Sequence, residues 1–335
     1  MNLLRGLSLC LVFVFATAQA REPLSPADQV KGMTRGVNIV GYDPLWRDAS
    51  KARFKPRHFK IIREGGFNSV RIVLGAFRFM NDKNELPASW FATLDELLVH
   101  SLGIERLTVI LDEHDFGLCG RDVAACRPRL MAFWTQVAER YKDASDRLVF
   151  EILNEPNRAM DPVWNDVLAE ALAIIRKTNP TRNVIIGPAF WNNVGWLDRL
   201  VLPENDRHII VTVHYYLPMR FTHQGARWTP EYQGLSGVTW GTPAEYAALD
   251  QDFDAVQAWA KKHDRPILLG EFGAYDNAPM ESRVKYTAAV ARAAEKRGWA
   301  WSYWQFDSDF VVYFIDQDEW NEPIHRALIP ADGGK

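Results

Sequence analysis

Apolar segments of strand length alternate with amphipathic segments of helix length along almost the whole chain, and this alternation limits the possible folds more than any other feature. The apolar segments are hydrophobic at successive positions, which is typical of strands buried on both faces of a parallel sheet. We predict strands over residues 34–41, 68–75, 108–115, 148–156, 183–191, 209–216, 266–275 and 299–307.

The segments between these strands have the apolar spacing of helices. We predict helices over residues 55–64, 89–101, 129–143, 162–177, 243–263 and 279–297, with a short one over 193–202. Asp161 and Thr242 are the expected N-caps of two of them. Eight strands that alternate with about eight helices predict a single-domain α/β fold, the (β/α)8 or TIM barrel. A doubly wound open sheet is the alternative, but we find no glycine-rich phosphate loop after the first strand.

Length and composition fit one such domain. The chain has 335 residues, of which 47% are hydrophobic and 24% charged, and its formal net charge is −3. A barrel of this class takes about 250 residues or more. The sequence has no block of like charges and no basic stripe, so we expect no nucleic-acid partner.

The N-terminus has the features of a secretory signal peptide. Arg5 supplies the positive charge, residues 7–17 form an apolar run, and Ala18-Gln19-Ala20 is an A-x-A cleavage site. The run is too short to span a bilayer and no later segment looks transmembrane, so no membrane partner is expected. We predict a signal peptide over residues 1–20, an N-terminal lead-in over 21–33 and a catalytic domain over 34–330. Cleavage near Ala20 would leave the protein secreted or periplasmic.

Polar and aromatic residues gather at the predicted carboxyl ends of the strands, where barrel enzymes carry their active sites. In chain order they are Tyr42, Trp46, Arg71, His114, Asp115, Asn154, Glu155, Trp191, His214, Tyr216, Glu271, Trp304 and Asp307. Two long loops, residues 217–241 and 308–321, follow the sixth and eighth strands. Long loops in a compact domain are often functional.

Two glutamates among these residues suggest a specific chemistry. Glu155 follows an apolar run within Asn154-Glu155-Pro156, and Glu271 follows another within Gly270-Glu271-Phe272. Glycoside hydrolysis needs one protonated carboxylic acid and one ionised carboxylate. The fourth and seventh strands lie on opposite sides of an eight-stranded barrel, so the two side chains could meet across a sugar.

Eight residues, in order and each at a predicted strand end, resemble the motif of glycoside hydrolase family 5, the cellulase-like retaining (β/α)8-barrel glycosidases. They are Arg71, His114, Asn154, Glu155, His214, Tyr216, Glu271 and Trp304. The resemblance extends from about residue 35 to residue 328. Each short motif alone is weakly specific, whereas the ordered set is strongly so.

The resemblance implies that Glu155 is the general acid/base and Glu271 the nucleophile. We expect the ionised Glu271 to raise the pKa of Glu155, so that Glu155 keeps its proton near neutral pH. We expect a hydrogen bond from Arg71 to depress the pKa of Glu271, and Tyr216 to donate a second one.

The remaining residues of the motif would bind the substrate or position the two glutamates. Asn154 would hold the sugar 2-hydroxyl, and Trp304 would form a platform under the sugar. His114 and His214 would bind substrate hydroxyls or hold the carboxylates in place. A hydrolase of this type needs no metal and no cofactor, and we expect neither.

Aromatic side chains at the mouth would suit the apolar faces of pyranose rings. The candidates are Trp46, Trp191, Trp228, Trp240 and Tyr275, each of which could equally be a packing residue. We predict a monomeric endo-β-1,4-glucanase that acts on a β-linked polysaccharide or oligosaccharide. A β-mannanase, another β-glycanase or an exo-β-glucosidase of the same family is the alternative.

Two other classes of protein remain open. A non-catalytic sugar-binding barrel has no need of two such acids, which argues against it. A metal-dependent barrel hydrolase would use the histidines and Asp112 as ligands.

The tripeptide Asn-Glu-Pro occurs a second time, at Asn321-Glu322-Pro323. No buried strand precedes it, and Pro323 looks like the start of a helix. We therefore predict that Glu322 is a first-turn acid that complements a helix dipole and takes no part in catalysis.

Two cysteines remain after the predicted cleavage, Cys119 and Cys126, seven residues apart. Cysteines this close in an exported protein often form a disulfide. A metal site would need more ligands, and only His114 is near. We predict a Cys119–Cys126 disulfide.

Overall fold

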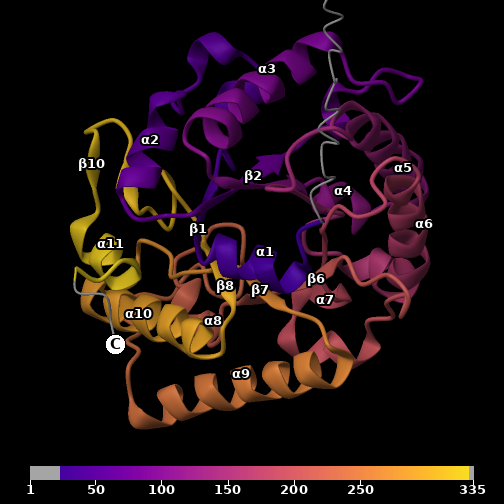
Figure 1. The fold of residues 1–335 in the computed structure, drawn as a ribbon. Helices are drawn as coiled ribbons and strands as arrows, with labels where there is room; N and C mark the ends of the chain where they lie inside the picture. The colour runs from indigo at the N-terminus through magenta and orange to yellow at the C-terminus, as the bar shows by residue number, and fades with distance from the viewer. Residues whose placement is uncertain (1–22, 332–335) are drawn as a thin grey trace, which may run out of the picture.

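A computed structural model of the chain describes residues 23–331, and the predicted signal peptide lies outside these residues. Eight parallel strands form a closed barrel in the order of the sequence, which confirms the predicted fold (Figure 1). The strands are β1 (Arg35–Ile39), β2 (Ser69–Leu74), β3 (Thr108–Glu113), β4 (Leu148–Glu151), β5 (Val184–Ile186), β6 (Ile209–Tyr215), β7 (Ile267–Phe272) and β8 (Ala300–Tyr303).

Helices surround the barrel, as Figure 1 shows, and share an apolar core with its strands. They are α2 (Arg57–Glu64), α3 (Ala88–Leu98), α5 (Val123–Arg140), α6 (Trp164–Arg176), α9 (Pro243–His263), α10 (Met280–Lys296) and α11 (Glu322–Leu328). Three four-residue segments follow strands β3, β5 and β6: α4 (Phe116–Cys119), α7 (Ala189–Asn192), which contains non-helical backbone angles, and α8 (Met219–Thr222). Short 3-10 turns cover Pro44–Trp46, Ala49–Lys51, Phe77–Phe79, Arg158–Val163 and Val194–Arg199, and a π-helical segment covers Val99–Ile104. Among the described helices, none combines the length and apolarity that a membrane span needs.

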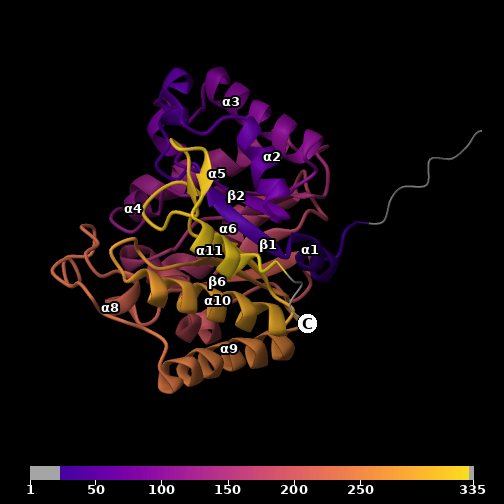
Figure 2. The same ribbon diagram turned by 90° about the vertical axis from the view of Figure 1, so that its left-hand side faces the viewer.

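The amino end of the barrel is closed by a helix from the predicted lead-in. This helix, α1 (Pro26–Met33), lies across the strands in Figure 1, and Figure 2 shows it at the end opposite to α8. Ser25 caps it by accepting a hydrogen bond from the amide of Asp28. Val30 and Met33 pack against side chains from six strands. These are Ile110, Val149, Ile185, Ile210, Leu268 and Ala300.

Several helix boundaries follow local signals that the sequence displays. Thr242 caps α9 in a reciprocal capping box with Glu245, and Pro243 opens the helix. Glu322 lies in the first turn of α11, where it pairs with Arg326. The second Asn-Glu-Pro is thus a helix start, as expected. The predicted disulfide is present and joins Cys119 of α4 to Cys126 of α5, with 4.9 Å between the Cα atoms.

Other predicted boundaries were wrong. Asp161 is no N-cap, because α6 begins later, at Trp164, and the Asp161 carboxylate instead accepts a hydrogen bond from the amide of Phe190. The strand predicted over 183–191 ends at Ile186. The helix predicted over 193–202 is the 3-10 turn Val194–Arg199, and α5 begins at Val123, six residues before the predicted start. Asp122 caps α5 through the amide of Ala125, which explains the earlier start.

Met33→Ala tests whether the packing of α1 against the amino end of the barrel stabilises the protein. The Met33 side chain is fully buried, so its truncation should leave a cavity and lower the free energy of unfolding by about 2–5 kcal/mol. Urea denaturation of the variant and the wild type measures the difference. Lys31→Ala, an exposed change in the same helix, should stay within about 0.5 kcal/mol of the wild type. If the Met33 variant is as stable as the control, α1 does not stabilise the barrel through Met33.

Candidate active site

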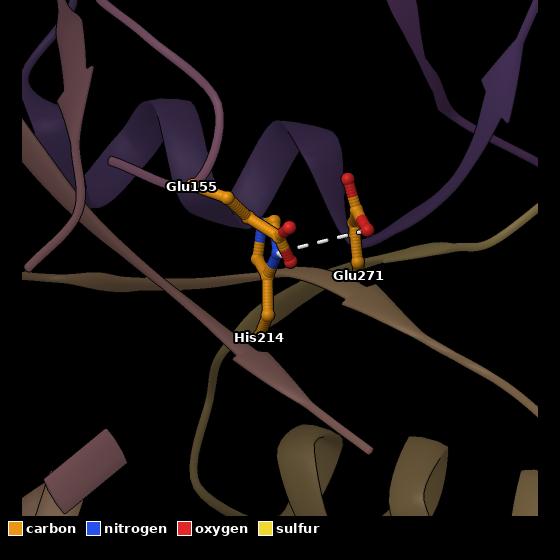
Figure 3. A group of neighbouring side chains, drawn as sticks. All are labelled: Glu155, His214 and Glu271. Carbon is orange, nitrogen blue, oxygen red and sulfur yellow. Dashed lines mark hydrogen bonds and ion pairs between the residues drawn. The ribbon is translucent and has the colours of Figure 1, made fainter. Parts of the chain in front are cut away.

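Glu155 and Glu271 project into the same space at the carboxyl end of the barrel (Figure 3). Glu155 lies in the loop after β4 with a positive φ of 41°, an uncommon conformation for a residue with a side chain. Glu271 is the fifth residue of β7. The ligand atoms of Glu155, Glu271 and His214 all lie within 4.8 Å of one another. The structure therefore brings together the two carboxylates that the sequence singled out.

An irregularity in β7 sets Glu271 beside His214. The pairing of β6 with β7 shifts by one residue, so that Val213 faces Leu269 but His214 faces Glu271. Gly270 is the extra residue, and a Cβ there would lie 2.5 Å from Thr212 Oγ1. Only glycine fits without displacing its neighbours. This bulge re-aims the side chain that follows it, a frequent device next to active sites.

The Arg71 guanidinium is fully buried among acceptors from several strands. It bonds both carboxylate oxygens of Glu151, at 2.7 and 3.0 Å. Its Nη1 donates to Glu271 Oε1 and to Asn38 Oδ1, and its Nη2 to Asn154 Oδ1, each at 2.8 Å. Asp112 Oδ2 lies 3.1 Å from Nη2. Every N–H of the side chain therefore has an acceptor, and the pKa of Arg71 is raised well above its usual value, mainly by the Asp112, Glu151 and Glu271 carboxylates against the effect of burial.

Two hydrogen-bond donors contact the carboxylate of Glu271. Oε1 accepts from Arg71, and Oε2 accepts from the hydroxyl of Tyr216 at 2.9 Å. Contrary to expectation, the pKa of Glu271 is raised, because burial outweighs the lowering by His214 and Arg71. The hydrogen-bond donors thus limit an upward shift that burial alone would make larger.

Glu155 has fewer partners. Its Oε1 lies 2.8 Å from Nδ1 of His214, and 15% of its side chain is exposed. Burial raises the pKa of Glu155 to about 7, with a smaller contribution from Glu151. The expectation that Glu271 would supply this shift is wrong, since desolvation is its main cause. A carboxyl group with this pKa holds a proton near neutral pH, as a general acid must.

Asn154 is oriented by Arg71. Because its Oδ1 accepts from the guanidinium, its Nδ2 is left as a donor, 3.4 Å from Nε2 of His114. His114 in turn places Nδ1 2.5 Å from Asp112 Oδ2, and its ring stacks parallel to Trp304, with 5.6 Å between ring centres. Burial lowers the pKa of His114 to about 4, so the ring is neutral at neutral pH. These contacts bring His114, Asn154 and Trp304 to the same site as the two glutamates.

The aromatic candidates fall into two groups. Trp228 is 49% exposed and meets the ring of Tyr275 edge-on at 5.0 Å, and Trp191 is half-buried in the loop after β5. Trp46 and Trp240 are core residues. Trp46 stacks on Trp90 and donates to the carbonyl of Val73, while Trp240 packs on Tyr246 and Tyr286. Trp46 and Trp240 are therefore packing residues, and the prediction that they form sugar subsites was wrong.

Sequence reasoning missed two residues of the site, Glu151 and Asn38. Both are fully buried and bond Arg71. A signal for them was available, because each interrupts an otherwise apolar strand, and ionisable or amide side chains are seldom fully buried unless paired. From the sequence, Asp112 could be a metal ligand in a metal-dependent hydrolase, but a positioning role is preferred. It bonds His114 and Arg71, and burial raises its pKa to about 7.

Among the described residues, Glu155, His214 and Glu271 are the group that could hold a metal ion. Their oxygen and nitrogen donors suit a transition metal. Without a metal, the same three side chains are two carboxyl groups with the His214 imidazole within reach of both. A parallel barrel with two glutamates this close together at its carboxyl end has the arrangement of a (β/α)8 glycoside hydrolase.

Comparisons with known proteins agree with this class. Residues 30–309 match the cellulase family, glycosyl hydrolase family 5, and the chain belongs to this family. It is 30% identical over 326 residues to Endoglucanase H of Acetivibrio thermocellus, an alignment that covers 92% of this chain but only 34% of that protein.

Solved structures match over almost their full length. The endoglucanase Cel5A of Thermotoga maritima is 37% identical, with a TM-score of 0.86 and coverage of 91% of this chain and 100% of that chain. Cel5A has been solved with cellobiose and with mannotriose. The cellulose synthase subunit Z of Clostridioides difficile is 35% identical, with a TM-score of 0.83 and coverage of 89% and 99%.

The pKa of Glu155 predicts the basic limb of the pH profile. Burial favours the protonated form of Glu155. The carboxyl group therefore keeps its proton below pH about 7 and loses it as the pH rises through that value. The kcat/KM for a soluble β-glucan should therefore fall above pH about 7. It should fall far less for an aryl glycoside whose leaving group needs no proton.

Asp112→Asn is the matched control, because burial raises the pKa of Asp112 to about 7 as well. The control variant should keep the basic limb. If Asp112→Asn loses the basic limb, the limb reports the titration of Asp112, and its assignment to Glu155 is wrong.

Proposed function

We propose that this protein is a retaining endo-β-1,4-glucanase that works by double displacement, with Glu155 as acid/base and Glu271 as nucleophile. The separation of the two carboxylates carries the proposal. Retaining glycosidases hold the two groups about 5–5.5 Å apart, whereas inverting enzymes need about 6.5–9.5 Å to admit a water. One oxygen of Glu155 lies within 4.8 Å of one oxygen of Glu271, and this close approach of the two groups supports retention.

In the first step Glu271 attacks the anomeric carbon. The carbon–oxygen bond to the leaving sugar breaks, and the leaving oxygen takes the proton of Glu155. The product is a glycosyl ester of Glu271, and Glu155 becomes a carboxylate. The negative charge thus passes from Glu271 to Glu155, and the net charge of the pair is unchanged.

In the second step water replaces the enzyme at the anomeric carbon. Glu155, now ionised, accepts a proton from the water as the new carbon–oxygen bond forms and the ester bond breaks. Glu271 leaves as a carboxylate, which the N–H of Arg71 and the hydroxyl of Tyr216 stabilise. The enzyme returns to its starting protonation state.

Asn154 and Trp304 would act on the sugar itself. With its oxygen held by Arg71, Asn154 offers an N–H donor to the 2-hydroxyl, a contact that strengthens as the transition state forms. Trp304 lies parallel to His114 beside the same site, and its ring would support the apolar face of the pyranose.

The substrate assignment rests on the relatives. Endoglucanase H and Cel5A are named for endo-acting glucan hydrolysis, but this chain spans only about a third of the length of Endoglucanase H. The mannotriose complex of Cel5A favours β-mannan as the second candidate substrate. We also propose that the protein is exported to the periplasm or the medium, where it would encounter such polymers. The N-terminal segment supports this proposal because it has the pattern of a signal peptide.

Replacement of either glutamate by glutamine tests the assignment. Glu155→Gln and Glu271→Gln should each lower kcat on a β-1,4-glucan by about 100- to 10,000-fold, because one loses the proton donor and the other the nucleophile. The wild type is assayed on β-1,4-glucan, β-mannan and xylan with sizing of the products. Internal cleavage of glucan is expected, and release of single sugars alone would indicate an exo enzyme.

Azide distinguishes the nucleophile from a structural carboxylate. In Glu271→Ala the small anion can enter the vacated space and attack the anomeric carbon, so azide should restore part of the rate and yield a glycosyl azide of inverted stereochemistry. Glu322→Gln, in the second Asn-Glu-Pro, is the matched control and should keep the wild-type rate. Wild-type rates in both Gln variants of the pair would overturn the assignment.

A further inference from the structure

Three consecutive residues after β5 adopt the left-handed backbone conformation. The φ angles of Phe190, Trp191 and Asn192 are 59°, 61° and 52°, and these residues account for the segment labelled α7. Residues with side chains rarely adopt this conformation, and a run of three is unfavourable. Strain of this kind persists only where surrounding contacts enforce it, and it concentrates at functional sites.

The contacts that enforce the turn come from the loop that carries Glu155. The amide of Trp191 donates to the carbonyl of Pro156 at 3.0 Å, and the amide of Phe190 donates to Asp161 at 2.8 Å. On the other side, Asn193 forms a parallel bridge with His214 of β6. The turn therefore connects the loop of the general acid to the strand of the histidine beside it.

The side chain of Asn192 is confined against His214. It is fully buried, and its Nδ2 lies 3.3 Å from Nε2 of the imidazole. Gly187 lies on the other side of the amide, where a Cβ would come within 2.3 Å of Asn192 Oδ1. The amide is thus held between the end of β5 and the ring.

The opposite nitrogen of His214 faces the two glutamates. Nδ1 lies 2.8 Å from Glu155 Oε1 and 3.6 Å from Glu271 Oε2. Figure 3 shows the three side chains together. Burial lowers the pKa of His214 to about 4, so the ring is neutral in the working range. A neutral imidazole has one N–H and one lone pair, so the partner of one nitrogen determines what the other offers.

We propose that Asn192 is a positioning residue that donates its amide N–H to His214 Nε2 and so keeps the imidazole N–H on Nδ1, directed at the oxygens of Glu155 and Glu271. In this tautomer His214 stabilises the Glu155 carboxylate that forms when the acid gives up its proton. In the other tautomer the lone pair of Nδ1 would face both carboxyl groups and compete for that proton. The consequence for catalysis rests on the proposed function, whereas the position of the proton does not.

The wild-type protein tests the tautomer directly. Nitrogen-15 NMR distinguishes protonated from unprotonated ring nitrogens, and the signals of His214 are assigned by their loss in His214→Gln. The expected spectrum has a protonated Nδ1 and an unprotonated Nε2 at neutral pH. A protonated Nε2 with an unprotonated Nδ1 would overturn the proposal, whether or not the protein hydrolyses any glycan.

Two substitutions keep the left-handed backbone and change the donor. Aspartate and glycine both tolerate positive φ. Asn192→Asp replaces the donor by an acceptor, so the proton should move to Nε2, whereas Asn192→Gly should leave a mixture of tautomers. Each should lower kcat by about tenfold to 100-fold with little change in KM, by analogy with the loss of a hydrogen-bond partner that orients a metal-ligating histidine.

Asn193→Asp is the matched control. It adds the same charge one residue further on, where the side chain bonds the amide of Gly195 rather than the histidine. The control should keep the wild-type tautomer and rate. The other groups that act on His214, which are Glu155, Glu271, Arg71, Glu151 and His114, are unchanged in all these variants. An Asn192→Asp protein with the wild-type tautomer, or a control with an equal loss of kcat, would contradict the positioning role.

Discussion

The buried guanidinium of Arg71 is the interaction on which the rest of the site depends. An isolated charge in the interior of a barrel would cost several kcal/mol, so the cation requires acceptors on every side. They come from Asn38 in β1, Glu151 in β4, Asn154 after β4 and Glu271 in β7, and Asp112 in β3 lies within ion-pair distance. One side chain therefore fixes the relative positions of groups from four other strands. The same contacts orient the amide of Asn154 and one oxygen of Glu271.

This network also separates the roles of the two glutamates. Burial raises the pKa of both, but Glu271 accepts hydrogen bonds from Arg71 and Tyr216, whereas among the described residues the Glu155 carboxyl group has a hydrogen-bond partner in His214 alone. The group with more donors is suited to carry the charge, and the group with fewer is suited to carry the proton. Both glutamates depend on unusual backbone geometry. Glu155 and the turn from Phe190 to Asn192 all have positive φ, and the bulge at Gly270 aligns Glu271 with His214.

Much of this arrangement was predictable from the residues alone. The order of the strands, their parallel direction and the meeting of Glu155 with Glu271 follow from apolar runs that end in polar residues. Periodicity could not show where β5 ends, because Phe190 and Trp191 are as apolar as a strand residue and only tertiary contacts force them into a left-handed turn. Likewise, nothing local distinguishes Trp46 and Trp240, which pack in the core, from Trp228, which is exposed. The cause of the pKa shift of Glu155 depends on burial, which a sequence does not reveal.

The stereochemistry of the first product tests the central claim most directly. Proton NMR during the early hydrolysis of a β-1,4-gluco-oligosaccharide distinguishes the two anomers before they interconvert. One oxygen of Glu155 lies within 4.8 Å of one oxygen of Glu271, which is nearer to the arrangement of retaining than of inverting enzymes, so the β-anomer should form first. Initial formation of the α-anomer would show inversion, and it would contradict the roles assigned to Glu155 and Glu271.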